Sequence, residues 1–143
     1  MTKSLVILLC FSAVLVNAQN AEEAAVKDVV TNAYIIGIHN NGDIDEIRKG
    51  FHPDFNMLRL IDNKLQPLSI EDWIASIEKS RKEGNKAPAK TEGTFVDVDI
   101  TGNNAVVKLE LFRNDKKIFT DYLVLYKFAE GWRIVSKTFF RHP

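Results

Sequence analysis

The chain has 143 residues, of which 45% are apolar or aromatic and 27% charged, and its 19 basic and 19 acidic side chains balance to a formal net charge of zero. Nucleic-acid binders gain most of their affinity from a basic surface, so we expect no nucleic-acid partner. Cys10 is the only cysteine, and it lies in the N-terminal leader. The rest of the chain must therefore form one domain that is stabilised by an apolar core without disulfides.

Residues 1–18 have the pattern of a secretory signal peptide. Lys3 precedes an apolar run over residues 5–16, and the small residue Ala18 suits the position before a signal-peptidase cut. The run is too short for a permanent membrane span, which needs about 20 apolar residues. We therefore predict a bacterial protein exported to the periplasm or secreted, with a mature domain of residues 19–143 that has no membrane attachment.

The first half of the mature chain predicts three helices. Apolar positions at three- and four-residue spacings over residues 21–41 indicate a long amphipathic helix, which ends at an Asn-Asn-Gly sequence suited to a left-handed cap. Asp43, with Glu46 three residues later, has the spacing of a capping box and opens a short second helix. Ser69 and Asp72 repeat that spacing and open a third helix.

Extended runs fill the space between the second and third helices and the whole second half of the chain. Six are predicted: residues 55–61, 65–68, 96–100, 107–111, 117–128 and 132–141. Short turns between neighbouring runs imply antiparallel pairing. Helices first and a meandering sheet last define an α+β fold, in which the helices pack in a strongly bent antiparallel sheet.

Several local sequences resemble the nuclear transport factor 2-like superfamily, which includes SnoaL-like and ketosteroid-isomerase-like proteins. They are the Asn-Asn-Gly-Asp end of the first helix, the Phe-His-Pro-Asp-Phe turn at residues 51–55, the helix containing Trp73, and the Gly-Trp-Arg-Ile-Val-Ser-Lys-Thr-Phe strand at residues 131–139. Within the superfamily the chain is similar to the branch described as putative lumazine-binding, over residues 21–142. The resemblance implies a cystatin-like cone, a pocket at its wide end and often a homodimer.

Catalysis of the ketosteroid-isomerase type requires a tyrosine donor and a carboxylate base. Tyr34 falls close to where isomerase-like members place the tyrosine, but Arg59 stands where they place the base, and a guanidinium cannot abstract a proton at neutral pH. The acids at positions 43, 45 and 46 are explained by helix capping. The three histidines are far apart, so we predict no metal site and no cofactor.

The predicted pocket is lined by Tyr34, Ile38, Phe55, Arg59, Trp73, Tyr122, Tyr126 and His142. We expect it to bind a small apolar or aromatic molecule without catalysis. One alternative is a hydratase, isomerase or cyclase, which requires an acid, tyrosine or histidine with a strongly shifted pKa inside the cavity. Another is an association module whose own side chains fill the cavity. Both faces of the strand at 117–128 are apolar, so we expect the outer face to form a homodimer interface.

Overall fold

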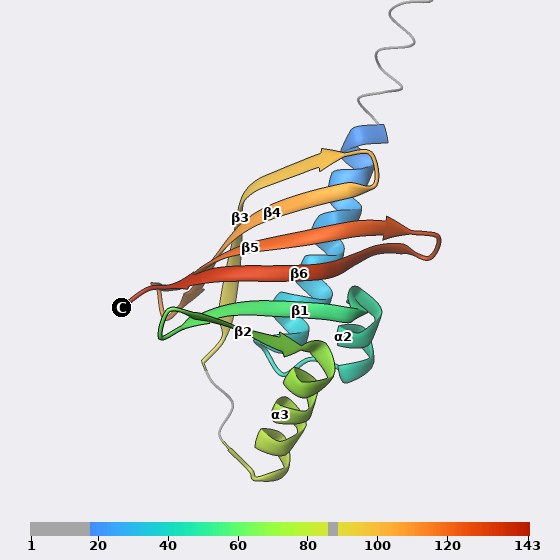
Figure 1. Ribbon diagram of the computed structural model, residues 1–143. Coiled ribbons are helices and arrows are strands. Elements are labelled where there is room, and N and C mark those ends of the chain that lie inside the picture. Colours follow the sequence, from blue (N-terminus) through green and yellow to red (C-terminus); the bar gives the residue numbers. More distant parts are fainter. Residues whose placement is uncertain (1–17, 86–88) are drawn as a thin grey trace, which may run out of the picture.

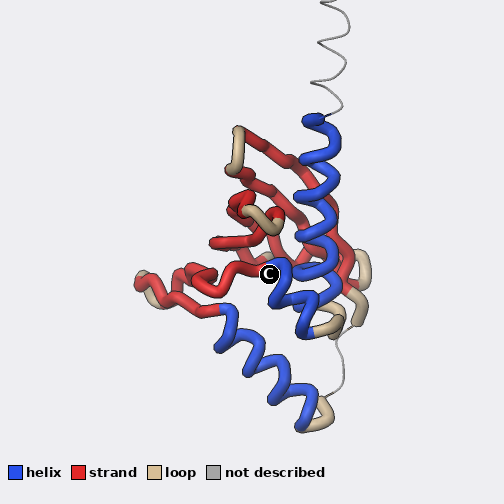
Figure 2. Tube along the Cα trace, turned by 90° about the vertical axis from the view of Figure 1, so that its right-hand side faces the viewer, coloured by secondary structure: helices blue, strands red, loops and turns tan. Residues whose placement is uncertain are grey.

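The computed structural model describes residues 18–85 and 89–143, which form the predicted α+β fold (Figure 1). The signal peptide prediction concerns residues 1–18, of which 1–17 lie outside the described residues. Six strands make one curved sheet in the order β2-β1-β6-β5-β4-β3. Figure 2 shows the first helix running along one face of this sheet.

Each predicted extended run is a strand. The strands are β1 (Phe51–Ile61), β2 (Lys64–Ser69), β3 (Thr91–Thr101), β4 (Asn104–Arg113), β5 (Lys116–Phe128) and β6 (Gly131–Arg141). Four neighbouring pairs are antiparallel, but β1 and β6 pair in parallel, with Phe51 opposite Ile134. The sheet is therefore mixed, whereas the sequence predicts an antiparallel sheet. Short turns indicate pairing only between strands that follow one another, and β1 and β6 do not.

The first helix changes its geometry halfway along. Residues 18–29 are α-helical and continue directly into the π-helical segment η1 (Val30–Ile38). The backbone amide of His39 donates to the carbonyl of Tyr34 at 3.2 Å, which is the five-residue spacing of a π-helix. Asn41 follows with a φ of 56°, so the predicted left-handed cap is confirmed.

The second helix, α2 (Ile44–Gly50), begins where the sequence predicts. Asp43 Oδ1 accepts a hydrogen bond from the backbone amide of Asp45 at 2.8 Å. Glu46 forms an ion pair with Lys49 instead of returning to the cap residue. The N-cap is confirmed, while the reciprocal half of the predicted capping box is replaced by this surface pair.

The third helix, α3 (Ile70–Lys82), projects from the β2 edge of the sheet (Figure 1). Ser69 Oγ accepts from the backbone amide of Asp72 at 3.1 Å and donates to the carboxylate of the same residue at 2.7 Å. The cap therefore satisfies one of the free amides of the first turn. Ile70 and Ile74 are buried and anchor the helix to the core.

The core lies between the first helix and one face of the sheet. On β5 the residues that face the helix, Asp121, Leu123 and Leu125, are fully buried. Tyr122 and Tyr126 on the opposite face are 43% and 42% exposed. Because successive residues of a strand point to opposite sides, this alternation identifies the inner and outer faces of the sheet.

Candidate functional site

Three ionisable side chains meet inside the core. Tyr34 comes from η1, Asp121 from β5 and Lys137 from β6. The Tyr34 hydroxyl donates to Asp121 Oδ2 at 2.7 Å, and Lys137 Nζ lies 2.8 Å from Asp121 Oδ1. Their residues are only 1%, 0% and 3% exposed. We call these three residues the interior cluster.

Strand register brings the two charged members together. Lys137 on β6 lies opposite Leu123, two residues beyond Asp121 on β5, so the charged side chains are diagonal neighbours on the inner face. Tyr34 then reaches them from the middle of η1, across the space between helix and sheet. One oxygen of the Asp121 carboxylate thus accepts a hydrogen bond from the Tyr34 hydroxyl, and the other oxygen lies next to the Lys137 ammonium.

Burial dominates the acid–base properties of the cluster. It raises the pKa of the Tyr34 hydroxyl well above its ordinary value, and the charge and hydrogen bond of Asp121 act in the same direction. Burial also lowers the pKa of the Lys137 ammonium, while Asp121 opposes this shift. Tyr34 therefore remains a neutral hydrogen-bond donor, and Lys137 releases its proton more readily than an exposed lysine does.

His39 lies beside the cluster. Its ring packs edge-on against the Tyr34 ring, with centroids 4.8 Å apart, and its Nε2 atom is buried without a hydrogen-bond partner among the described residues. Burial, aided by the positive charges of Lys137 and Arg113, lowers the pKa of His39 to about 3. The imidazole is therefore neutral near pH 7 and retains one unused polar atom.

Aromatic rings surround the lysine end of the cluster. Lys137 Nζ lies 4.2 Å from the centroid of the Phe139 ring and 5.4 Å from that of Tyr34. Phe139 is only partly buried and packs edge-on against Phe119, which is also partly buried, at 5.6 Å. Both phenylalanines are therefore partly open to solvent, and Phe139 also contacts the Lys137 ammonium.

Four of the predicted pocket residues lie in or against the core. Tyr34, Ile38 and Phe55 are buried, and Trp73 is partly buried against them. The Trp73 ring lies 6.2 Å from Tyr34 and 6.3 Å from Phe55. These rings pack directly on one another. Such packing is also expected of the association module, in which the protein's own side chains fill the cavity.

The other four predicted pocket residues lie elsewhere. Arg59 donates from Nε to the carbonyl of Gln66 at 3.4 Å, within the β1–β2 hairpin. Tyr122 and Tyr126 are on the outer face of the sheet. His142 Nε2 lies 2.9 Å from the hydroxyl of Thr120, near the C-terminal end of the chain. The structure does not bring these four residues to the interior cluster.

Sequence reasoning missed three residues of the site: His39, Asp121 and Lys137. Asp121 had a signal, because it shares a strand face with three apolar residues. The comparison with ketosteroid-isomerase-like proteins sought the base at position 59 on β1, whereas the carboxylate next to Tyr34 comes from β5. The interior thus contains a tyrosine and a histidine with shifted pKa values, and the enzyme alternative requires an acid, tyrosine or histidine of this kind.

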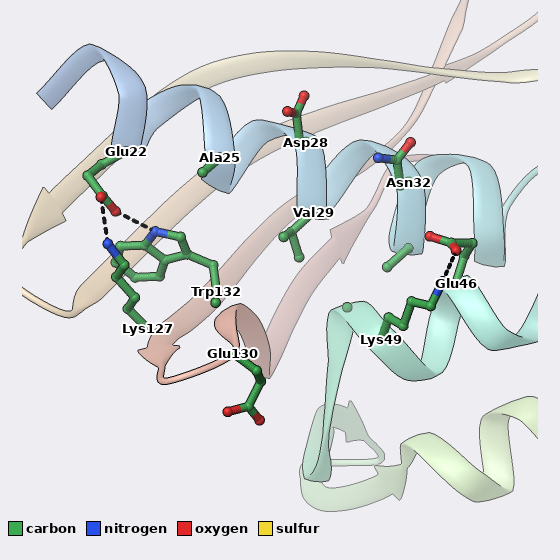
Figure 3. Close-up of a pocket in the computed structure, with 13 residues that line it drawn as sticks. Glu22, Ala25, Asp28, Val29, Asn32, Glu46, Lys49, Lys127, Glu130 and Trp132 are labelled. Carbon is green, nitrogen blue, oxygen red and sulfur yellow. Dashed lines mark hydrogen bonds and ion pairs between the residues drawn. The ribbon is translucent and has the colours of Figure 1, made fainter. Parts of the chain in front are cut away.

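A separate groove of about 430 Å³ lies between the first helix, α2 and the β5–β6 turn (Figure 3). Glu22 forms one wall, where its carboxylate pairs with Lys127 at 2.6 Å and accepts from the Trp132 indole at 2.8 Å. The hydrogen bonds to Lys127 and Trp132 lower the pKa of Glu22. Glu46 and Lys49 form a second ion pair on the opposite wall (Figure 3). These four charged side chains are 36–71% exposed, so solvent screens them, whereas the members of the interior cluster are at most 3% exposed.

Across residues 18–85 and 89–143, no three His, Cys, Asp or Glu side chains are grouped so that they could hold a metal ion. Among the helices in the same part of the chain, none is long and apolar enough to cross a membrane.

Solved structures similar to this chain define the class of fold. A nuclear transport factor 2-like protein of unknown function from Shewanella baltica OS155 matches with a TM-score of 0.70 and 24% identity, covering 86% of this chain and 95% of that one. A similar protein from Silicibacter pomeroyi DSS-3 matches with a TM-score of 0.70 and 20% identity, covering 87% and 98%. The fold is that of the nuclear transport factor 2-like superfamily, as the sequence predicts.

The family follows from the sequence model that matches residues 21–140. The chain belongs to the family described as putative lumazine-binding. A curated relative, named aldolase FrzH, from Cladobotryum sp., is 29% identical over 117 residues, which are 80% of this chain and 90% of that protein.

Proposed function

We propose that the protein binds a small planar organic molecule in the interior of the cone, with its polar edge at the interior cluster. One observation carries the proposal: a carboxylate, an ammonium and a phenol are held together away from water among aromatic rings. Such burial rarely stabilises a fold relative to apolar side chains, and strongly perturbed ionisable groups gather at functional sites. The cluster is therefore better explained by a ligand than by stability.

The chemistry of the cluster suits a molecule that carries a carbonyl group and an N–H group. The Tyr34 hydroxyl and the Lys137 ammonium are donors for a carbonyl oxygen, and the Asp121 carboxylate is an acceptor for an N–H. Lumazine, a planar bicycle with such groups, fits this pattern and agrees with the family description. The ligand reaches the cluster by displacing the partly buried rings of Phe119 and Phe139.

Calorimetric titration with lumazine tests the proposal. Tyr34→Phe removes the hydroxyl inside the core and keeps the ring, and we expect it to weaken binding about tenfold, the usual effect of one hydrogen bond. Tyr122→Phe makes the same chemical change on the outer face and leaves the affinity unchanged. Equal affinities for the two variants contradict the site. So does the absence of lumazine binding at millimolar concentration together with no copurifying small molecule in native mass spectrometry.

A second candidate function is acid–base catalysis on a carbonyl compound. It is favoured by the carboxylate beside two hydrogen-bond donors and by the relative named as an aldolase. Asp121 would take a proton from the carbon next to a carbonyl, and Tyr34 and Lys137 would hydrogen-bond the resulting enolate oxygen. The enolate carbon then bonds to the carbonyl carbon of an aldehyde, and the proton held by Asp121 passes to the new alkoxide.

Hydrogen exchange in D2O separates catalysis from binding. If the second function is correct, the protein speeds the replacement of the methyl protons of pyruvate by deuterium, which proton NMR detects without an aldehyde. Asp121→Asn abolishes the acceleration, because an amide cannot accept the proton. If wild-type protein gives only the buffer rate with pyruvate, acetone and dihydroxyacetone, this second function is rejected and binding remains.

We also propose that the protein is a homodimer joined through the outer face of the sheet. Support comes from exposed apolar side chains on three adjacent strands, Val106, Tyr122, Tyr126 and Phe140, which are between 42% and 60% exposed. Tyr126→Glu is expected to convert the dimer to a monomer in light scattering after gel filtration. Leu60→Glu, an equally drastic change at a 72% exposed position in the β1–β2 hairpin, is the control. A wild-type monomer contradicts the proposal.

Export to the periplasm or the medium is proposed on the sequence of residues 1–18 alone. Expression of the full chain in bacteria, followed by intact mass measurement of the periplasmic fraction, tests it. The expected product begins at Gln19. Protein that retains Lys3 and remains in the cytoplasm contradicts the assignment.

A further inference from the structure

A basic pocket of about 250 Å³ lies at the end of the sheet where the β4–β5 turn meets the end of β6. It is lined by Arg113, Lys116, Lys117, Ile118, Phe119, Arg141, His142 and Pro143. We call these eight residues the basic pocket. Four of them are cationic, and none is aspartate or glutamate. This is a local excess of positive charge in a chain whose formal net charge is zero.

Neighbouring acids neutralise only part of this charge. Glu110 pairs with Lys117 at 2.6 Å. Asp115, in the same turn, lines a different hollow together with Lys90 and Glu92. The ion pairs found among residues 18–85 and 89–143 include neither Lys116 nor Arg141. Two exposed cations therefore remain available for a ligand, beside the guanidinium of Arg113.

Strand pairing and hydrogen bonds hold the pocket in shape. Arg113 on β4 lies opposite Lys116 on β5, and Phe119 on β5 lies opposite Arg141 on β6. Cations from three neighbouring strands therefore lie at the same end of the sheet. Arg113 donates from Nε and Nη2 to the hydroxyl of Thr91 at 3.3 and 3.0 Å, which fixes the guanidinium.

The last residues of the chain are also held in place. The backbone amide of His142 donates to the carbonyl of Ile118 at 3.0 Å, and its imidazole lies within hydrogen-bond distance of the Thr120 hydroxyl. Ile118 and Phe119 give the pocket an apolar side next to its charged side. The pocket therefore combines fixed cations with a surface on which an apolar group can pack.

We propose that the basic pocket binds a small organic anion, with its phosphate or carboxylate group on Arg113, Lys116 and Arg141 and its apolar part on Ile118 and Phe119. Like charges gathered in one place repel one another, and an anion removes that repulsion while forming charge-assisted hydrogen bonds. This inference goes beyond the proposed function and does not depend on it, because the anion-binding residues Arg113, Lys116 and Arg141 are not members of the interior cluster.

Titration with phenyl phosphate, followed by nitrogen–proton NMR of the backbone amides, tests the proposal. We expect saturable shifts concentrated at residues 116–119 and 141–142. Lys116→Gln with Arg141→Gln weakens binding at least about tenfold, because two charge-assisted contacts are lost. The control is Lys64→Gln with Lys82→Gln, which removes the same charge from two exposed positions elsewhere and leaves the affinity unchanged.

Two further probes identify the contributions of charge and ring. Phenylacetate reports whether a carboxylate replaces the phosphate, and inorganic phosphate reports binding without an apolar group. Inorganic phosphate is expected to bind more weakly than phenyl phosphate, and equal affinities contradict the role of Ile118 and Phe119. Shifts that do not saturate, or an equal loss of affinity in the control pair, mean general attraction to a charged surface and overturn the site.

Discussion

Replacing Lys137 by methionine removes the ammonium that lies 2.8 Å from Asp121 Oδ1 and keeps an unbranched side chain inside the core. The Asp121 carboxylate is completely buried, so the substitution leaves it without its ion-pair partner and shielded from bulk solvent. Tyr34 still donates to its other oxygen. The substitution therefore isolates the loss of one charged partner from any large loss of packing.

The expected cost is about 3–5 kcal/mol, the usual penalty for leaving one member of a buried ion pair alone. Surface screening does not reduce it, because both side chains are at most 3% exposed. Since a domain of this size has a total stability of about 5–15 kcal/mol, the single variant is close to unfolding. Asp121→Leu combined with Lys137→Met removes both charges and should cost only about 1–3 kcal/mol, chiefly because the Tyr34 hydroxyl loses its acceptor. Adding Tyr34→Phe removes that hydroxyl and restores near wild-type stability.

Urea unfolding followed by circular dichroism measures the free energy of unfolding for the single, double and triple variants. The order of stabilities distinguishes the electrostatic explanation from a packing explanation. If stability falls at each added substitution, packing decides the outcome. A loss below about 1 kcal/mol for Lys137→Met, with an unchanged dependence on urea concentration, would refute the reasoning and show that water reaches Asp121.

Three other predictions concern stability and use the same urea assay. His39 takes up a proton in the unfolded state near its ordinary pKa of 6.5 but in the folded state only near 3, so acidification through this window destabilises the protein by up to about 5 kcal/mol. His39→Phe makes the acid dependence shallower, and parallel curves for the two proteins contradict this. Gly50→Ala places a methyl group against Ala33 and costs about 1–3 kcal/mol, whereas an unchanged stability means that the two helices separate easily. Ser69→Ala removes the α3 cap and costs about 1 kcal/mol, while the mid-helix control Ser76→Ala has a smaller effect.

Local sequence chemistry determined most of the secondary structure. Asp43 and Ser69 are N-caps because their side chains satisfy free amides of the first turn, and this depends only on the next two or three residues. Alternating apolar residues located the strands, because successive side chains of a strand point to opposite faces of the sheet. These preferences act over a few residues, so the order of helices and strands, and with it the α+β class, could be read from the sequence.

The interior cluster depended on contacts that no local pattern encodes. Tyr34 and Asp121 are 87 positions apart, and they meet only because the first helix packs across β5. Both faces of β5 are apolar enough to be the inner one, and the structure selects the face that carries Asp121. Tyr122 and Tyr126, which the sequence placed in the pocket, are consequently on the outside.

Lys137 shows why such a site escapes prediction. Counting in steps of two from the buried residue Ile134 places Ser136 inside the sheet and Lys137 outside. A register shift beside Leu125 adds one residue to β6 at this point, so the alternation changes and Lys137 points inward. The sequence by itself determined the elements and their order. Only the tertiary structure decided which side chains face one another, because strand register and helix packing are set by the whole core.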